Sequence, residues 1–121
     1  MKHPQSLTLC VPVMNLSATQ TYSFLMHLNS IADFVDSFIV IDSSVSPIFF
    51  DDLLFINIAS KIKFLRSPAN GIYAAWNIGF EHCFTSHIIF LGHDDRLYTD
   101  YLSSLRNLIN LEHKYTLVFG D

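Results

Sequence analysis

Short apolar runs alternate along this chain with stretches in which apolar residues recur every three or four positions. Runs of this length are typical of buried strands, and the longer period is typical of helices that pack on one face. We therefore predict five strands, at residues 7–13, 38–41, 62–65, 87–91 and 115–119. A predicted helix precedes each strand after the first.

The first two predicted helices begin at polar residues that suit a helix N-terminus. Ser17 and Gln20 have the spacing of a capping box. The apolar stripe after them is Phe24, Leu28, Ile31 and Val35. Ser46 offers a cap that is followed by Pro47 in the first turn. The stripe of this second helix is Phe50, Leu53, Leu54, Asn57 and Ile58.

The third and fourth predicted helices lie on either side of the fourth strand in the sequence. Asn70 is the expected cap of the third helix. Its buried stripe is Ile72, Ala75, Trp76, Gly79, Phe80 and Cys83. Thr99 is the expected cap of the fourth helix. The residues expected inside are Leu102, Leu105, Leu108 and Ile109.

The alternation of strands and helices predicts an α/β fold, with a mostly parallel, Rossmann-like sheet and helices on both of its faces. With 121 residues and no internal repeat or linker, residues 1–121 are expected to form a single domain. The sequence stops directly after the last predicted strand. We therefore expect a truncated domain.

Composition narrows the class of protein. Half of the residues are hydrophobic and 15% are charged, which indicates a globular chain. The net charge of -4 argues against a nucleic-acid binder, which needs a basic face. The high apolar content indicates covered surface, with a peripheral membrane contact, a homo-oligomer or a missing remainder of the domain as the alternatives.

Cysteine usage and hydropathy bear on the compartment. Cys10 and Cys83 lie in apolar runs, which favours buried free thiols over a disulfide and a reducing compartment. The apolar segment within residues 1–15 is too short and interrupted for a signal peptide, and no run approaches the ~18 apolar residues of a membrane span. We expect a cytoplasmic protein, with membrane-peripheral association left open.

Polar residues follow the predicted strands at the edge where parallel sheets bind ligands. They are Asn15, Asp42, Arg66, the pair Asp94-Asp95, and Asp121. Asp42 stands where an acid commonly binds a ribose or a base, and a turn residue is the alternative interpretation. The absence of a glycine-rich loop after the first strand argues against a dinucleotide or P-loop site.

The acid pair Asp94-Asp95 ends the fourth strand. Adjacent carboxylates repel one another there, and Mg²⁺ or Mn²⁺ that bridges to a substrate phosphate relieves the repulsion. A solvated turn in which one Asp caps the next helix is the alternative. His93 is either a ligand or a hydrogen-bonded turn residue. Arg66 and Arg96 are either phosphate contacts or solvated surface residues.

Five segments together resemble glycosyltransferase family 2, whose members have the GT-A fold. GIYAAWNIG at 71–79 matches a G-I-Y-x-A-x-N-x-G helix, and IIFLGHDDRLY at 88–98 matches an F-L-x-x-D-D strand end. VPVMN at 11–15 is similar to the opening P-x-x-N. IVIDSS at 39–44 is similar to the nucleotide-contacting strand end, and VFGD at 118–121 to V-x-x-G-D. The resemblance covers essentially the whole chain.

The resemblance implies transfer of a sugar from a nucleotide-sugar donor of the UDP type to an unknown glycan or lipid-linked acceptor, with inversion, in surface polysaccharide or glycan synthesis. It implies that Asp94 and Asp95 bind Mn²⁺ or Mg²⁺ through the donor's diphosphate, where a cation stabilises the leaving group. The residues expected to bind the nucleotide-sugar are Pro12, Asn15, Asp42, Gly71, Asn77, His93 and Asp94.

Three residues depart from the family's pattern. Gly92 stands where many members have an acid or Asn, Trp76 where Arg is common, and Ala74 where Asp is common. Each departure weakens a polar contact. The family's general base lies beyond the last strand of this chain. We therefore expect the chain to lack the acceptor-side half and its catalytic base, and not to turn over alone.

Two other functions are alternatives at this point. A non-catalytic remnant or interaction subunit would keep the GT-A fold without the activity. A phospho-receiver-like signalling module would also combine an α/β fold with an acid pair, but its pair follows the first strand and a Lys closes the fifth. Here the pair follows the fourth strand, which disfavours the receiver.

Overall fold

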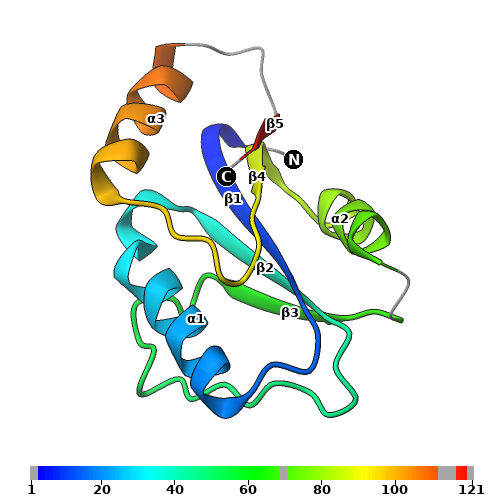
Figure 1. The fold of residues 1–121 in the computed structure, drawn as a ribbon. Helices are drawn as coiled ribbons and strands as arrows, with labels where there is room; N and C mark the ends of the chain where they lie inside the picture. Colours follow the sequence, from blue (N-terminus) through cyan, green and yellow to red (C-terminus); the bar gives the residue numbers. More distant parts are fainter. Residues whose placement is uncertain (1–2, 69–70, 112–116, 120–121) are drawn as a thin grey trace.

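The computed structural model describes residues 3–68, 71–111 and 117–119 of the chain. Its sheet has five strands in the order β3-β2-β1-β4-β5, and every neighbouring pair is parallel (Figure 1). The strands are β1 His3–Val13, β2 Ser37–Asp42, β3 Ile62–Arg66, β4 Thr85–Phe90 and β5 Leu117–Phe119. The predicted parallel sheet is confirmed. The strand order reverses at β1, between β2 and β4.

Helices cover both faces of the sheet, as predicted. The helical elements are α1 Ala18–Ser30, the 3₁₀ helix η1 Ala32–Phe34, α2 Ile72–Glu81 and α3 Thr99–Leu111. In Figure 1, α1 and α3 lie on one side of the sheet and α2 lies on the other. The larger core contains residues of α1 and α3, and the smaller one contains residues of α2.

Strand β1 separates the two cores, because successive side chains of a strand point to opposite faces. Its odd-numbered residues from Leu7 to Val13 are buried in the core with α1 and α3, whereas Cys10 is buried in the core with α2. Gly79 lets α2 approach the sheet closely, since a Cβ there would overlap the Sγ atom of Cys10. Cys10 and Cys83 are free and buried, as predicted.

The capping box of α1 is present as predicted. Ser17 Oγ accepts a hydrogen bond from Gln20 N–H at 3.0 Å, and Gln20 Oε1 accepts one from Ser17 N–H at 2.9 Å. The helix is shorter than the apolar stripe indicated, because it ends at Ser30 and η1 follows. Val35 is nevertheless buried, so the stripe identified core residues beyond the helix itself.

The predicted second helix is wrong. Residues 43–51 have no regular structure and residues 52–61 form turns. Ile48 N–H donates to the Asp42 carboxylate at 2.8 Å, a contact outside any helix, and it fixes the start of the segment in a non-helical form. Ile58 is buried as expected, but Leu53 is 87% exposed, and the buried Phe55 lies outside the predicted stripe. The spacing of apolar residues predicted a helix here because it carries no information about the hydrogen bond from Ile48 to Asp42.

Some residues expected inside helices lie outside. Ile72 and Phe80 of α2 are exposed, because the sheet contacts the side of the helix that carries Ala75 and Gly79. Leu108 of α3 is exposed, since it is turned about 100° from the buried Ile109 around the helix. Three predictions fall partly or wholly outside the described residues. They concern the helix cap Asn70, the start of the fifth strand at 115–116, and Asp121 at a strand end.

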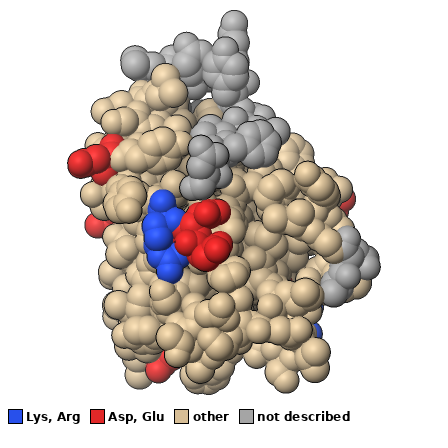
Figure 2. Space-filling view, in the orientation of Figure 1, with Lys and Arg blue, Asp and Glu red and all other residues tan. Residues whose placement is uncertain are grey.

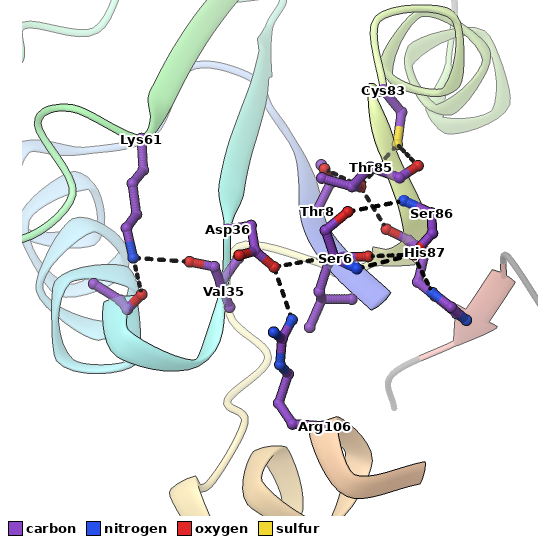
Figure 3. Close-up of polar contacts among 12 residues, drawn as sticks. Ser6, Thr8, Val35, Asp36, Lys61, Cys83, Thr85, Ser86, His87 and Arg106 are labelled. Atoms are coloured by element: carbon purple, nitrogen blue, oxygen red, sulfur yellow. Dashed lines mark hydrogen bonds and ion pairs between the residues drawn. The ribbon is translucent and has the colours of Figure 1, made fainter. Parts of the chain in front are cut away.

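Polar groups, some buried and some at the surface, hydrogen-bond to one another near the amino ends of β2 and β4 (Figure 3). Thr8 and Thr85 hydroxyls are 2.6 Å apart, and the Ser86 hydroxyl is 2.7 Å from Nδ1 of His87. Asp36, just before β2, accepts hydrogen bonds from Leu7 N–H and from an Arg106 nitrogen, both at 2.7 Å. We call this group of hydrogen-bonded residues at the amino end of the sheet the polar anchor: Thr8, Asp36, Thr85, Ser86, His87 and Arg106.

Candidate functional site

A cavity of about 480 Å³ opens at the carboxyl ends of β1 and β2, beside the N-terminus of α2. Open α/β sheets bind ligands at this edge, where the strand order reverses. The cavity is lined by Pro12, Val13, Met14, Ser43, Gly71, Ile72, Ala75 and His93. It therefore brings together three residues predicted to bind the donor, Pro12, Gly71 and His93, from three separate segments of the chain.

Each of these three residues reaches the cavity for a local reason. Pro12 lies near the end of β1, paired with Ile41 of β2. Gly71 precedes α2 with φ +94°, a conformation that other residues adopt only with strain. His93 follows β4 and keeps its backbone in place by accepting an Arg96 hydrogen bond at 3.0 Å. Gly71 has no side chain to cap α2, so no side chain at this position accepts from the first N–H groups of the helix. Such N–H groups, together with the helix dipole, favour an anion.

Asn15 joins the ends of β1 and β2. It has φ +52°, its N–H donates to Ser44 Oγ at 2.8 Å, and its Oδ1 atom accepts the Val45 N–H at 2.8 Å. It lines a neighbouring, larger cavity of about 640 Å³ between α1 and residues 44–55, and does not line the donor cavity. Its role in donor binding stays a prediction.

Asp42 organises the loop after β2. The residue is only 1% exposed, and its two carboxylate oxygens accept the N–H groups of Ser44 at 2.9 Å and Ile48 at 2.8 Å. An Arg66 nitrogen lies 3.3 Å from Oδ2. Burial on its own would raise the pKa of Asp42, but hydrogen bonds from Ser44 and Ile48 together with the Arg66 charge hold it below its usual value.

Arg66 is committed to the same loop. Besides its contact with Asp42, it donates to the Ser44 carbonyl at 2.6 Å. The structure supports the turn interpretation of Asp42, because its carboxylate accepts the Ser44 N–H two residues on and holds the loop whose residue Ser43 lines the donor cavity. Contact between Asp42 and a nucleotide stays a prediction.

The acid pair lies in the loop after β4. Asp94 is exposed and Asp95 is partly buried. A Cβ atom on Gly92 would lie 2.9 Å from Asp95 Oδ2 and 3.2 Å from Asp94 Oδ1, so both carboxylates turn toward the same place. Asp95 Oδ2 also accepts the Gly92 N–H at 2.9 Å. Gly92, a departure from the family's pattern, is therefore the residue that admits this arrangement.

Few charged groups appear on the face of the molecule that Figure 2 shows. In Figure 2, an acidic and a basic group adjoin near the middle of the visible face, over the segment between β4 and α3. Arg96 in this segment donates to the carbonyl oxygen of Asp95 at 2.9 Å. The positive charge thus lies next to the pair, held by backbone atoms.

The donor atoms of the pair suit a hard cation. Mg²⁺ prefers oxygen ligands and is commonly held by one or two carboxylates together with substrate phosphates. Among the residues that the structure describes, no group of three or more His, Cys, Asp and Glu side chains is placed to hold a metal ion. A cation at Asp94 and Asp95 would therefore need phosphate and water oxygens to complete its coordination.

Asn77 and Trp76 take different positions in α2. Asn77 is exposed and does not line the donor cavity, so its predicted role stays a prediction. Trp76 packs against the smaller core, with its ring 5.2 Å from that of Phe90. The sequence had not indicated Met14 or Ser43 as lining residues, since neither has a chemistry that marks a site.

The model of the family described as "Glycosyl transferase family 2" matches residues 29–120. The chain belongs to glycosyl transferase family 2. The match contains Asp42, Gly71 and the segment from His93 to Asp95, whereas Pro12 and Asn15 precede it. No curated protein is similar enough to the chain to count as a match.

Membership confirms the predicted family and the GT-A type of α/β fold. The family acts with nucleotide-sugar donors and glycan acceptors in general, so the broad assignment to glycosyltransferases is supported and the phospho-receiver alternative is set aside. In the described ranges, the helices are all too short or too polar to cross a bilayer.

Proposed function

We propose that this chain binds a nucleotide-sugar donor, of the UDP type, in the cavity between β1, β2 and α2, and presents it for transfer to a glycan or lipid-linked acceptor. The observation that carries the proposal is the convergence of Pro12, Gly71 and His93 on one cavity at the reversal of strand order. These residues come from three of the segments that resemble the family. Membership of the family supports the same chemistry.

The lining of the cavity divides by chemistry. Pro12, Met14, Ile72 and Ala75 offer apolar surface, which suits the faces of a nucleobase and ribose. The N-terminus of α2 offers backbone N–H groups and the positive end of the helix dipole, which suit a diphosphate. The Asp42 network keeps Ser43 at the rim between these two surfaces.

Asp94 and Asp95 are the residues that would hold a divalent cation, Mn²⁺ or Mg²⁺, on the donor. When bound, the cation would offset the negative charge that develops on the departing nucleoside diphosphate. The chain's own contribution is to aim the two carboxylates toward one place, through the Gly92 backbone and the hydrogen bond to Asp95. Inversion at the transferred sugar and a role in surface polysaccharide or glycan synthesis belong to this proposal.

Isothermal calorimetry with UDP-glucose tests the proposal, with and without Mn²⁺. We expect binding that requires Mn²⁺ and that weakens about tenfold or more in Asp94→Asn, because a charge-assisted contact is worth roughly 1.5–3 kcal/mol. Asp52→Asn is the matched control, since Asp52 is exposed and does not line the cavity. It should bind like wild type.

Two results would contradict the proposal. Binding that is equal with and without Mn²⁺ would remove the cation from Asp94 and Asp95. No binding of UDP-glucose or of other nucleotide-sugars would favour the non-catalytic remnant instead.

A further inference from the structure

The loop that carries the acid pair is held by helix α1, about seventy residues earlier in the chain. We call residues 92–97 the acid-pair loop. The N–H of Leu97 donates to Nε2 of His27 at 3.0 Å, and an Arg96 nitrogen donates to Oγ of Ser23 at 2.8 Å. Ser23 and His27 are four residues apart on α1 and so lie on the same face of the helix. Two successive residues of the loop are thus tied to one helix face.

Arg96 connects this attachment to the acid pair. The guanidinium nitrogen that does not reach Ser23 donates to the carbonyl oxygens of His93 at 3.0 Å and Asp95 at 2.9 Å. The planar guanidinium fixes the direction of its N–H donors. Through Arg96, the position of α1 therefore sets the position of the backbone on both sides of Asp94. A shift of Arg96 would therefore move both carboxylates.

We propose that Ser23 and His27 are positioning residues for the acid pair, that they hold the loop in the form in which both carboxylates turn toward one place, and that His27 does so only while its ring is neutral. The proposal rests on the proposed function where it concerns cation and donor binding. It assigns to α1 a role that lies outside the cavity.

The requirement for a neutral ring follows from the direction of the hydrogen bond. Nε2 accepts the Leu97 N–H, and an imidazolium has no acceptor because both of its nitrogens carry protons. Burial and the nearby Arg96 charge lower the pKa of His27. Arg96, Tyr98 and Asp100 line the same surface hollow as His27. Protonation would thus remove an acceptor and add a charge beside Arg96.

Amide hydrogen exchange of Leu97, measured by NMR, tests the attachment without any ligand. We expect exchange about tenfold faster in His27→Ala than in wild type at pH 8, since the loss of one hydrogen bond of ordinary strength changes an equilibrium by about that factor. His27→Gln supplies an acceptor at a similar reach that does not titrate, and it should keep the wild-type rate. Thr19→Ala, an exposed change on α1, is the control.

Calorimetry with Mn²⁺ and UDP-glucose on the same variants tests the consequence for the acid pair. His27→Ala should weaken binding about three- to tenfold at pH 8, and Ser23→Ala should weaken it less. Wild-type affinity should fall as the pH drops from 7.5 to 5.5, and His27→Gln should remove most of this fall. UDP-glucose is suitable because its diphosphate does not titrate in this range, and circular dichroism checks that each variant stays folded.

The outcomes separate this proposal from the proposed function. Equal Leu97 exchange in wild type and His27→Ala would overturn the positioning role, whatever the chain binds. A pH dependence that survives in His27→Gln and disappears in His93→Gln would assign it to the cavity and overturn the role of the neutral ring. If wild type binds no nucleotide-sugar at any pH, the proposed function fails, and the exchange rates still decide whether His27 holds the loop.

Discussion

The two ends of the parallel sheet use polar residues in opposite ways. At the amino end, buried or partly buried hydroxyls and a histidine hydrogen-bond to one another, as between Thr8 and Thr85 or Ser86 and His87 (Figure 3). At the carboxyl end, Asp94 is exposed, and it follows His93, which lines the donor cavity, although Asp94 itself does not line it. Satisfied polar groups stabilise a fold, whereas carboxylates turned toward one place cost free energy unless a ligand neutralises them. The polar anchor at the amino end therefore stabilises the fold, whereas the carboxyl end holds the candidate site.

Asp42 is the exception at the carboxyl end, because it behaves like the residues of the anchor. It is buried, and it accepts hydrogen bonds from Ser44 and Ile48 and faces Arg66. The contrast between the two ends therefore depends on how each carboxylate is partnered. Variants of single acids and the pH dependence of stability test this contrast, and we give these tests from the largest expected effect to the smallest.

Asp42→Ala should have the largest effect on stability. The change leaves two backbone N–H groups and the Arg66 charge without their acceptor, so we expect the free energy of unfolding to fall by about 3 kcal/mol. Asp42→Asn keeps one acceptor oxygen and should lose about half as much. Urea unfolding followed by circular dichroism measures both. A loss below about 1 kcal/mol in Asp42→Ala would show that the loop does not depend on this carboxylate.

Acid should weaken the anchor through His87. Burial lowers the pKa of this buried histidine, and the Arg106 charge lowers it further. The unfolded chain, with a usual pKa near 6.5, therefore takes up a proton that the folded chain resists. The contribution of His87 to stability is complete above pH 6.5 and is lost below it, by up to about 1.4 kcal/mol per pH unit.

Unfolding in urea between pH 8 and pH 5 measures this dependence. His27 contributes in the same direction, since its pKa is lowered too. His87→Asn should flatten the curve in part, and the double variant with His27→Gln should flatten it further. His82→Gln is the control, because His82 is exposed. A curve that rises as the pH falls would contradict the sign worked out here.

Asp36→Ala should cost about 1 kcal/mol and leave donor binding unchanged. The change removes one carboxylate, which accepts the Leu7 N–H and pairs with Arg106, and this side chain is about half exposed to solvent. Asp33→Ala, an exposed change three residues earlier, should cost nothing measurable. Weaker binding of UDP-glucose by Asp36→Ala than by Asp33→Ala would break the proposed separation of anchor and site.

Asp94→Ala should have the smallest effect on stability, within about 0.5 kcal/mol of wild type, because its side chain is exposed. Relief of repulsion from Asp95 favours a slight gain. The same variant should lose cation-dependent donor binding. A large loss of stability would place Asp94 with the anchor.

The fold was predictable where the sequence signal is local. Apolar runs located all five strands, and the signal was clearest for β2 and β4, which are buried along nearly their whole length. The second helix was not predictable, since the Asp42 carboxylate takes the Ile48 N–H from six residues away. The burial of Ile72 and Phe80 was misjudged for a related reason, because only the sheet decides which side of α2 is covered.

The sequence predicted part of the lining of the cavity at the carboxyl end of the sheet. The family resemblance named Pro12, Gly71 and His93 together, and the structure places them on one cavity at the carboxyl end of the sheet, while their roles in donor binding stay predictions. The sequence did not indicate the attachment of the acid-pair loop to Ser23 and His27, since nothing local marks a contact across about seventy residues. Gly92 was interpreted as a missing ligand, and only the positions of the two carboxylates show what a side chain there would displace.

Paramagnetic broadening by Mn²⁺ is the most direct test that a cation and a nucleotide-sugar meet at the carboxyl end. In the presence of UDP-glucose, substoichiometric Mn²⁺ should broaden the amide signals of residues 92–95 and of Gly71 and Ile72, and leave Ser86 and His87 sharp. Asp94→Asn should restore the broadened signals. Broadening centred on Asp51 and Asp52, or equal in wild type and Asp94→Asn, would contradict the site proposed at the end of β4.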